Sequence, residues 1–333
     1  MTSTAATAVP GTEVPAAPSR HLGSGLAIAV LSAAAFGLSG TLGAAMLDLG
    51  WSPVATVAAR VGGAFLVLLV PCALLLRRTG LPTLRESGRL VAYGVVAVAG
   101  AQLCYFSAVQ YLSVGVALLL EYLAPVLLIG WRWAHDRQRP AAPVLVGAAL
   151  ALLGLVLVLD LRNGLSLHPV GVLWGLSAAV CLAVYFVLSE EKPGRRSVHP
   201  LVLTTGGTAV GATVLLTVGM LGLLPLRVGF GDTELGGATV PWWLPMALLV
   251  LVSAVLSYLT GIVAVRRLGA GVASFVALTE VLFAVTFAAV LLDQLPTAGQ
   301  LLGGLLILSG IVAVQSEPFL AARARRSRRP TLR

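Results

Sequence analysis

Residues 108–117 read AVQYLSVGVA, and residues 264–273 read AVRRLGAGVA. The same offset of 156 residues carries the glycine pair in 147–154 onto the glycine pair in 303–310. Several glycines and alanines at fixed spacing are hard to obtain by chance, even in a chain rich in these residues. The sequence therefore contains a duplicated segment.

The chain is far more apolar than a soluble domain. Of its 333 residues, 58% are hydrophobic and 11% are charged, and its mean hydropathy is +0.96, whereas soluble domains carry about 25% charged residues. The apolar runs do not alternate as barrel strands would, and lipid offers backbone groups no partners, so the spans must be helices. Ten stretches approach the length of about 20 apolar residues that a spanning helix needs. They are residues 26–47, 54–76, 90–109, 114–131, 143–159, 170–188, 201–224, 243–265, 271–292 and 299–315.

The basic residues set the orientation. With both termini in the cytoplasm, 19 of the 22 lysines and arginines fall in inner loops or tails, two in outer loops and one within a span. Inner loops of membrane proteins carry this excess of positive charge, and the alternation holds loop by loop only for ten spans. The net charge of +9 is therefore an orientation signal rather than a sign of nucleic-acid binding.

The duplication and the span count together predict an inverted repeat. Each copy has five spans, an odd number, so the second copy begins on the opposite side of the membrane. Such repeats recur in secondary transporters, because two near-equivalent halves can exchange conformations around a central site. The predicted segments are a disordered cytoplasmic leader at 1–22, a first five-helix repeat at 23–160, a second five-helix repeat at 161–316 and a basic cytoplasmic tail at 317–333.

Three ionisable residues lie well inside predicted spans: Arg60, Glu121 and Glu280. Each opposes insertion by about 2.5–3.5 kcal/mol at a helix centre, so we expect all three to face the bundle interior. Under the 156-residue offset Glu280 falls one helical turn from Glu121, which predicts that both carboxyls lie on the walls of one cavity. Arg60 is close enough in depth to pair with Glu121.

Two interpretations of these charges remain open. In the functional one, a carboxyl near mid-depth takes up a proton or a cationic substrate group and releases it on the other side. In the structural one, ion pairs or hydrogen bonds hold the helices together. Arg60 is then either a structural partner of a carboxylate or a substrate ligand.

Polar side chains at similar depth are further candidate binding residues. They are Gln102, Tyr105, Tyr122, Tyr185, Tyr258 and Thr279. Interhelical hydrogen bonding is the alternative role for each of them. Pro125 removes a backbone donor and is expected to kink its helix one turn past Glu121, as a structural bend or as a gating hinge.

The sequence predicts no cofactor and no metal. Cys72, Cys104 and Cys181 all fall within spans, and no cluster of other ligand residues accompanies them. The heptad-spaced glycines of the fifth and tenth spans allow another helix to approach closely. They serve either packing within the bundle or a homodimer through these two helices.

These features together resemble a known family, the drug/metabolite transporter superfamily, and within it the EamA-like branch. The positions that carry the resemblance are Arg60 early in the second helix, Pro125 in the fourth, and Gly147, Gly154, Gly303 and Gly310 in the fifth and tenth. The resemblance covers about residues 26–315 and implies a ten-helix bacterial transporter. It also implies a central cavity lined by helices 3, 4, 8 and 9 together with helices 1 and 6.

The sequence thus predicts a secondary transporter of a small organic solute, such as an amino acid, a metabolite or a drug-like amine. Proton-coupled export across the plasma membrane is favoured, and facilitated diffusion or exchange without protons is the alternative. A non-transporting sensor or assembly subunit is a further alternative. An intramembrane protease is the enzymatic one, because residues 37–40, GLSG, resemble a rhomboid serine motif. All four histidines lie in tails or loops, away from that serine, so no enzyme is predicted.

Overall fold

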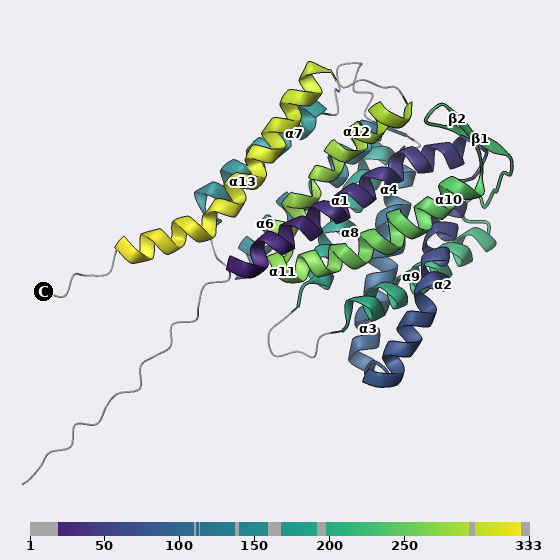
Figure 1. Cartoon of the computed structure of the whole chain (residues 1–333), viewed down its shortest axis with the longest axis horizontal. Coiled ribbons are helices and arrows are strands. Elements are labelled where there is room, and N and C mark those ends of the chain that lie inside the picture. The colour runs from purple at the N-terminus through teal and green to yellow at the C-terminus, as the bar shows by residue number, and fades with distance from the viewer. Residues whose placement is uncertain are drawn as a thin grey trace, which may run out of the picture.

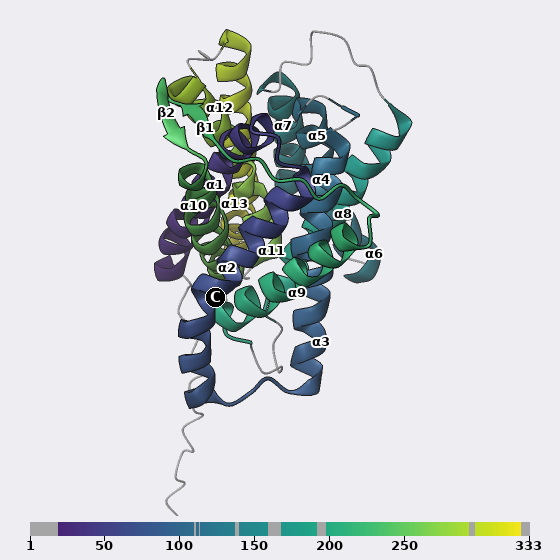
Figure 2. The same cartoon turned by 90° about the vertical axis from the view of Figure 1, so that its right-hand side faces the viewer.

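The computed structural model is a bundle of helices with a small two-stranded hairpin at one end (Figures 1 and 2). The structure describes residues 19–109, 111–112, 114–136, 140–158, 168–191, 198–292 and 297–327. Residues 1–18 of the predicted leader and residues 328–333 of the predicted tail lie outside this part. Helix α1 already begins within the predicted leader, and α13 continues into the predicted tail as far as Ser327.

The described chain falls into a first half, residues 19–158, and a second half, residues 168–327. The first half contains α1 (Ser19–Asp48), α2 (Pro53–Thr79), α3 (Leu84–Ala92), the π-helical η1 (Tyr93–Gly100), α4 (Ala101–Val109), α5 (Val114–Glu121), α6 (Ala124–Asp136) and α7 (Ala142–Val158). The second half contains α8 (Pro169–Ser189), α9 (Pro200–Met220), β1 (Asp232–Leu235), β2 (Ala238–Pro241), α10 (Trp243–Val250), the π-helical η3 (Leu251–Leu256), α11 (Ser257–Ala277), α12 (Thr279–Leu292) and α13 (Ala298–Ser327). Six of the described helical stretches are long and apolar enough to cross a membrane, and three further apolar helices are shorter. The chain is therefore an all-α polytopic membrane protein, apart from an antiparallel hairpin that the sequence pattern did not predict.

Local sequence explains where several helices begin. Pro53, Pro169 and Pro200 occupy the first turns of α2, α8 and α9, where a missing backbone donor costs nothing. A capping box between Thr83 and Glu86 starts α3. The third predicted span therefore begins at residue 84 rather than at residue 90.

Both halves contain a π-helical segment and a break in a predicted span. Each feature of the second half falls on its counterpart in the first half when the 156-residue offset is applied. The π-helical residues 251–256 of η3 fall on residues 95–100, which belong to η1. Residues 122–123 separate α5 from α6, and Leu278, which falls on residue 122, separates α11 from α12. The spans predicted as continuous at 114–131 and 271–292 are thus interrupted near the middle.

The break in the first half lies beside Pro125. This residue is the second residue of α6, a position at which proline fits at the start of a helix. The helix is interrupted at residues 122–123, in the turn before the proline, where the missing N–H and the ring of Pro125 are expected to disturb it. A second change of direction occurs at Gly269, whose φ of 78° separates residues 257–268 from residues 270–277.

The two ends of the bundle differ in chemistry (Figure 1). The arginine-rich end carries the end of α2 and the start of α3, which lie at the bottom of the view, and the Arg266–Arg267 pair of α11. The hairpin end, at the top, carries β1 and β2. There the Trp51 and Trp242 rings stack with centroids 5.9 Å apart. The Gly236 N–H donates to the Leu291 carbonyl at 3.0 Å, so the hairpin is tied to the end of α12.

The glycine-rich helices α7 and α13 pack against each other along their glycine stripes. A Cβ atom on Gly147 would lie 2.6 Å from the Gly310 carbonyl oxygen, and one on Gly154 would lie 2.5 Å from the Gly303 carbonyl oxygen. Only glycine therefore allows these two helices to approach so closely. The stripes are used for packing within one chain, which is the first of the two roles expected for them.

Candidate functional site

A cavity of about 440 Å³ lies inside the bundle. Its walls come from both halves, with contributions from α1, α2, η1, α4, α5, α8, α11 and α12. The polar and charged residues that line it are Ser32, Ser39, Thr41, Arg60, Gln102, Tyr105, Glu121, Tyr122, Tyr185, Tyr258 and Glu280. The volume falls in the range of about 300–1,000 Å³ typical of small-molecule sites.

The structure brings most of the predicted binding residues together in this cavity. Arg60, Glu121, Glu280, Gln102, Tyr105, Tyr122, Tyr185 and Tyr258 all line it. Thr279 does not line it, and its hydroxyl donates to the Val276 carbonyl at 2.7 Å, across the break between α11 and α12. Pro125 is buried outside the lining, in the first turn of α6.

Arg60 is the centre of the polar network. Its side chain is only 2% exposed. Nη1 donates to the Ser39 hydroxyl at 2.9 Å and to Gln102 Oε1 at 3.2 Å. Nη2 donates to the backbone carbonyl of Ser253 within the π-helical η3. The guanidinium thus holds α1, α4 and η3 together, and its Cζ atom lies 5.9 Å from the centre of the Phe36 ring.

The expected ion pair between Arg60 and Glu121 is not formed. In the described part of the chain, no carboxylate oxygen lies within 4.0 Å of the Arg60 guanidinium. The pair was expected only because the two residues lie at similar depth. A guanidinium can also donate its hydrogen bonds to neutral acceptors, and the sequence does not indicate which acceptors lie nearby. Arg60 therefore carries a buried positive charge that a hydroxyl, an amide and a carbonyl hydrogen-bond without neutralising.

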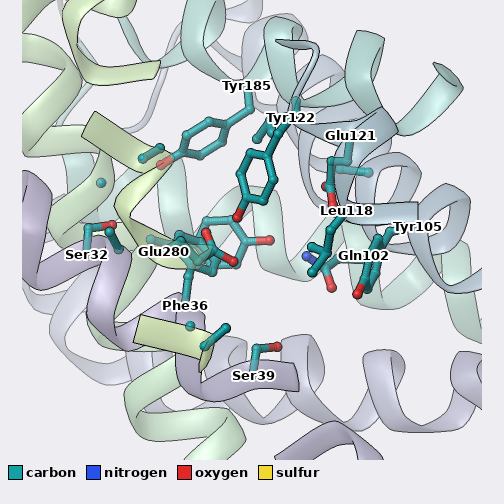
Figure 3. A pocket seen from close by; sticks show the side chains of 18 of the residues that line it. Ser32, Phe36, Ser39, Gln102, Tyr105, Leu118, Glu121, Tyr122, Tyr185 and Glu280 are labelled. Carbon is teal, nitrogen blue, oxygen red and sulfur yellow. The ribbon is translucent and has the colours of Figure 1, made fainter. Parts of the chain in front are cut away.

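The two carboxyl groups occupy different parts of the cavity. Figure 3 shows Glu280 beside Tyr122 and Phe36, and Glu121 on the opposite wall, near Tyr105. The Tyr122 hydroxyl points toward the Glu280 carboxyl group, so a residue at the break of the first half meets the acid of the second half. The two acids and Arg60 thus lie apart on the walls of a cavity that is otherwise mostly aromatic and apolar.

A run of aromatic rings forms one wall. The Phe36 and Tyr258 rings meet edge to face with centroids 5.2 Å apart, and the Tyr258 and Tyr185 centroids are 6.2 Å apart. The Tyr185 hydroxyl lies against Gly261, where any Cβ atom would overlap it. Gly261 therefore admits the tyrosine to the wall of the cavity.

The GLSG motif of residues 37–40 has a packing and hydrogen-bonding role. A Cβ atom on Gly37 would lie 2.9 Å from the Glu280 carbonyl oxygen, so glycine lets α1 approach α12 at the acid. Ser39 accepts from Arg60. The serine is thus engaged by an arginine, and the motif supports the two charged residues of the cavity.

The family resemblance implied that the first helix lines the cavity, but the sequence analysis named none of its residues as candidates. Ser32, Phe36 and Ser39 line the cavity from this helix. Their spacing of four and then three residues is the signature of one helix face, so this signal was present in the sequence. The Ser253 carbonyl could not have been found in this way, because its availability depends on the π-helical backbone.

The residues present do not suggest a metal centre. Among the described residues, no group of three histidine, cysteine or acidic side chains is placed to hold an ion. Cys72, Cys104 and Cys181 are free thiols. The chemistry available in the cavity is that of charge, hydrogen bonding and aromatic contact.

Fold and cavity together define a polytopic membrane protein with an internal solute-sized space. The chain belongs to the EamA-like transporter family, whose model matches it twice, at residues 23–160 and 169–315. This family is part of the drug/metabolite transporter superfamily. The chain is accordingly a membrane transporter rather than an enzyme.

Two relatives agree with this assignment, and a solved structure shares the fold. An uncharacterized transporter from Archaeoglobus fulgidus is 30% identical over 293 residues, which cover 88% of this chain and 97% of the relative. The uncharacterized inner membrane transporter YicL from Salmonella typhimurium is 24% identical over 243 residues, covering 72% and 77%. The crystal structure of another protein shares the fold, with a TM-score of 0.69 at 21% identity over 88% of this chain and 98% of that one.

Proposed function

We propose that the protein is an alternating-access secondary transporter that exports a small organic solute, with proton coupling through Glu121 and Glu280. The single observation that carries this proposal is the cavity between the two halves, which holds both acids and Arg60. Facilitated diffusion or exchange without protons is the second candidate. This candidate is favoured if replacing either acid leaves the pH dependence of flux unchanged.

The proposed architecture is ten spans in two inverted five-helix repeats. Support comes from the ten predicted stretches, each of which contains helix, and from the two family-model matches. The paired π-helical segments and the paired breaks at one offset add to it. In this arrangement the two broken helices approach the cavity from opposite sides, as discontinuous helices do in other transporters.

The proposed substrate is an amino acid, a metabolite or a drug-like amine. Arg60 offers a positive charge that no carboxylate neutralises within 4.0 Å in the described chain. Glu121, Glu280 and the tyrosines offer acceptors and aromatic faces to a cationic or aromatic group. A solute small enough for about 440 Å³ fits between them.

The proposed orientation places the arginine-rich end in the cytoplasm and the hairpin end outside the plasma membrane. Both termini then lie in the cytoplasm, as the excess of basic residues at that end predicts. A homodimer remains part of the proposal. It would use the outward leucine and valine faces of α7 and α13, because their glycine faces are turned toward each other.

A flux screen in proteoliposomes tests the proposal. Purified protein would be reconstituted and challenged with labelled amino acids and amines, with and without a pH gradient across the membrane. Flux that the gradient accelerates supports proton-coupled transport, and flux that ignores it supports the facilitated alternative. Absence of flux for every solute would contradict the proposal, and cleavage of peptides in the same vesicles would revive the protease.

A further inference from the structure

The carboxylate of Glu190 joins three elements at the arginine-rich end. Its two oxygens accept from Arg132 Nη2 of α6 at 3.0 and 2.9 Å. Oε1 also accepts from the backbone N–H of Ala270 at 3.1 Å. Ala270 is the first residue after the turn at Gly269, so the carboxylate caps the helical segment 270–277.

These contacts cross between the two halves. Arg132 belongs to the first half, whereas Glu190 and Ala270 belong to the second. Arg89 of the first half adds a second link, because its guanidinium donates to the Leu188 carbonyl and, at 2.8 Å, to the Glu190 carbonyl. The last turn of α8 is therefore fastened to α3, to α6 and to the start of the segment 270–277.

This fastened turn lies next to the lining of the cavity. Phe186, one helical turn before Glu190, lines the cavity, and so does Ala273, one turn after Ala270. In the other direction the lining extends to Leu47, one residue before the end of α1 at the hairpin end. The lining thus extends from Leu47, near the hairpin end, to Val265, the residue before the Arg266–Arg267 pair, and the Glu190 contacts lie at this second end.

We propose that Glu190 is the latch of an inner gate. This inference rests on the proposed alternating access. While the carboxylate holds Arg132 and the Ala270 N–H, α6 and the segment 270–277 stay together and the cavity is closed to the arginine-rich end. Release of both contacts frees the segment that leads to Leu278 and Glu280, so the latch links closure of the gate to the position of that acid.

The neighbouring residue provides a matched control. Glu191 pairs with Arg266 at 3.0 Å, and Arg266 also donates to the Val198 carbonyl. All three residues belong to the second half, so the Glu191 pair does not cross between the halves. The two adjacent glutamates thus form ion pairs of similar length, and of these two pairs the Glu190 pair crosses between the halves and the Glu191 pair does not.

The test measures access to the cavity from the arginine-rich end. In full-length protein with Cys72, Cys104 and Cys181 replaced by alanine, Ala29→Cys introduces a single thiol into the cavity lining. A membrane-impermeant maleimide would be applied to this side of oriented proteoliposomes, and the labelling rate would be compared between variants. Intact folding would be verified by size-exclusion elution.

We expect Glu190→Gln to raise the labelling rate about three- to tenfold, the factor for one partly exposed ion pair and one charged hydrogen bond. Glu191→Gln should stay within about twofold of the parent, because its pair does not bridge the halves. Equal rates in the two variants would overturn the latch. Should Glu190→Gln not fold, Arg132→Gln decides, since Arg132 is 45% exposed and its loss leaves the Ala270 cap in place.

The labelling needs no substrate, so its outcome is separate from that of the flux screen. A faster rate in Glu190→Gln without flux for any solute would contradict the proposed transport and leave the latch standing. Flux in the parent protein with unchanged labelling in both Glu190→Gln and Arg132→Gln would overturn only the latch.

Discussion

The broken helices of the two halves, residues 114–136 and 270–292, follow one plan but carry their acids on opposite sides of the break. Glu121 is the last residue of α5, before the first break, and Glu280 is the second residue of α12, after the second break. A helix C-terminus presents unpaired carbonyl groups and an N-terminus presents unpaired N–H groups. The two acids therefore meet opposite local fields, and we expect them to serve different steps.

The atoms that pack against the two breaks also differ. Gly37 of α1 lies against the backbone of α12, with its Cβ position 2.9 Å from the Glu280 carbonyl oxygen. Gly175 of α8 lies against α5, with its Cβ position 2.6 Å from Leu120 Cδ1 and 2.8 Å from Leu120 Cβ. The close contact at the second break is therefore with a backbone oxygen, and the one at the first break is with a leucine side chain whose Cβ atom moves only with its backbone. Duplication conserved the break and left its surroundings free to diverge.

Replacing the two acids one at a time should have the largest effect. We expect Glu280→Gln and Glu121→Gln each to abolish pH-driven flux, because an amide cannot carry a proton across the membrane. Only Glu280→Gln should also lower counterflow at equal pH, by about 10- to 100-fold, as loss of one charged hydrogen bond to a substrate predicts. Gradient-driven uptake and counterflow in the same proteoliposomes measure the two quantities. Unchanged flux in both variants would remove the carboxyls from the mechanism, and equal loss of counterflow would make the acids equivalent.

The next largest effect is expected at Arg60, which links the halves. Its guanidinium reaches Ser39 and Gln102 of the first half and the Ser253 carbonyl of the second. Arg60→Lys keeps the charge but cannot span all three acceptors, so we expect flux to fall about tenfold, since each unmade buried hydrogen bond costs about 1–3 kcal/mol. The melting temperature should fall with it. Arg77→Lys, at the exposed end of α2, is the control, and an equal response of both variants would contradict the role of Arg60.

Substitution of the packing glycines should give a smaller effect and sharpens the comparison directly. We expect Gly37→Ala to lower the free energy of unfolding by about 1–3 kcal/mol, because backbone must shift to accept the new methyl group. Gly175→Ala should cost a similar amount, because the Leu120 Cβ atom, 2.8 Å from the position of the new methyl group, moves only with its backbone. Gly40→Ala, also on α1, meets nothing within 4 Å and should be neutral or slightly stabilising. Thermal unfolding in detergent would rank the three variants, and a Gly37→Ala variant as stable as Gly40→Ala would contradict the close packing at the second break.

The sequence predicted the helical class and most of the cavity, because both depend on patterns that survive in one dimension. Apolar length locates spans, and the cost of a buried charge places Arg60, Glu121 and Glu280 inside the bundle. Pro125 predicted a bend near the first break, whereas the second break, the π-helical segments and the hairpin were not predicted. These features depend on the local backbone conformation of residues that are all similarly apolar. The periodicity of apolar residues therefore gives no signal for them.

Two expectations about contacts differ from the structure for the same reason. Thr279 was a candidate because it adjoins Glu280, but it lies outside the lining of the cavity, and its hydroxyl donates to the Val276 carbonyl. The ion pair expected for Arg60 was inferred from depth, and depth does not say which helices adjoin. Side-chain direction around a broken helix and contacts between distant helices need three dimensions.

The smallest expected effect tests the contact that joins the two breaks. Tyr122 lies at the first break, and its hydroxyl points toward Glu280, just after the second. Tyr122→Phe removes only this hydroxyl, and a hydrogen bond worth about 0.5–1.5 kcal/mol corresponds to about two- to tenfold. We expect pH-driven flux to fall by this factor while counterflow at equal pH changes less, because Glu280 keeps its carboxyl group and loses only one neighbour. Tyr111→Phe, at an exposed tyrosine, is the matched control. If the two variants were indistinguishable, the breaks would act independently, and the acids would communicate through the substrate rather than through Tyr122.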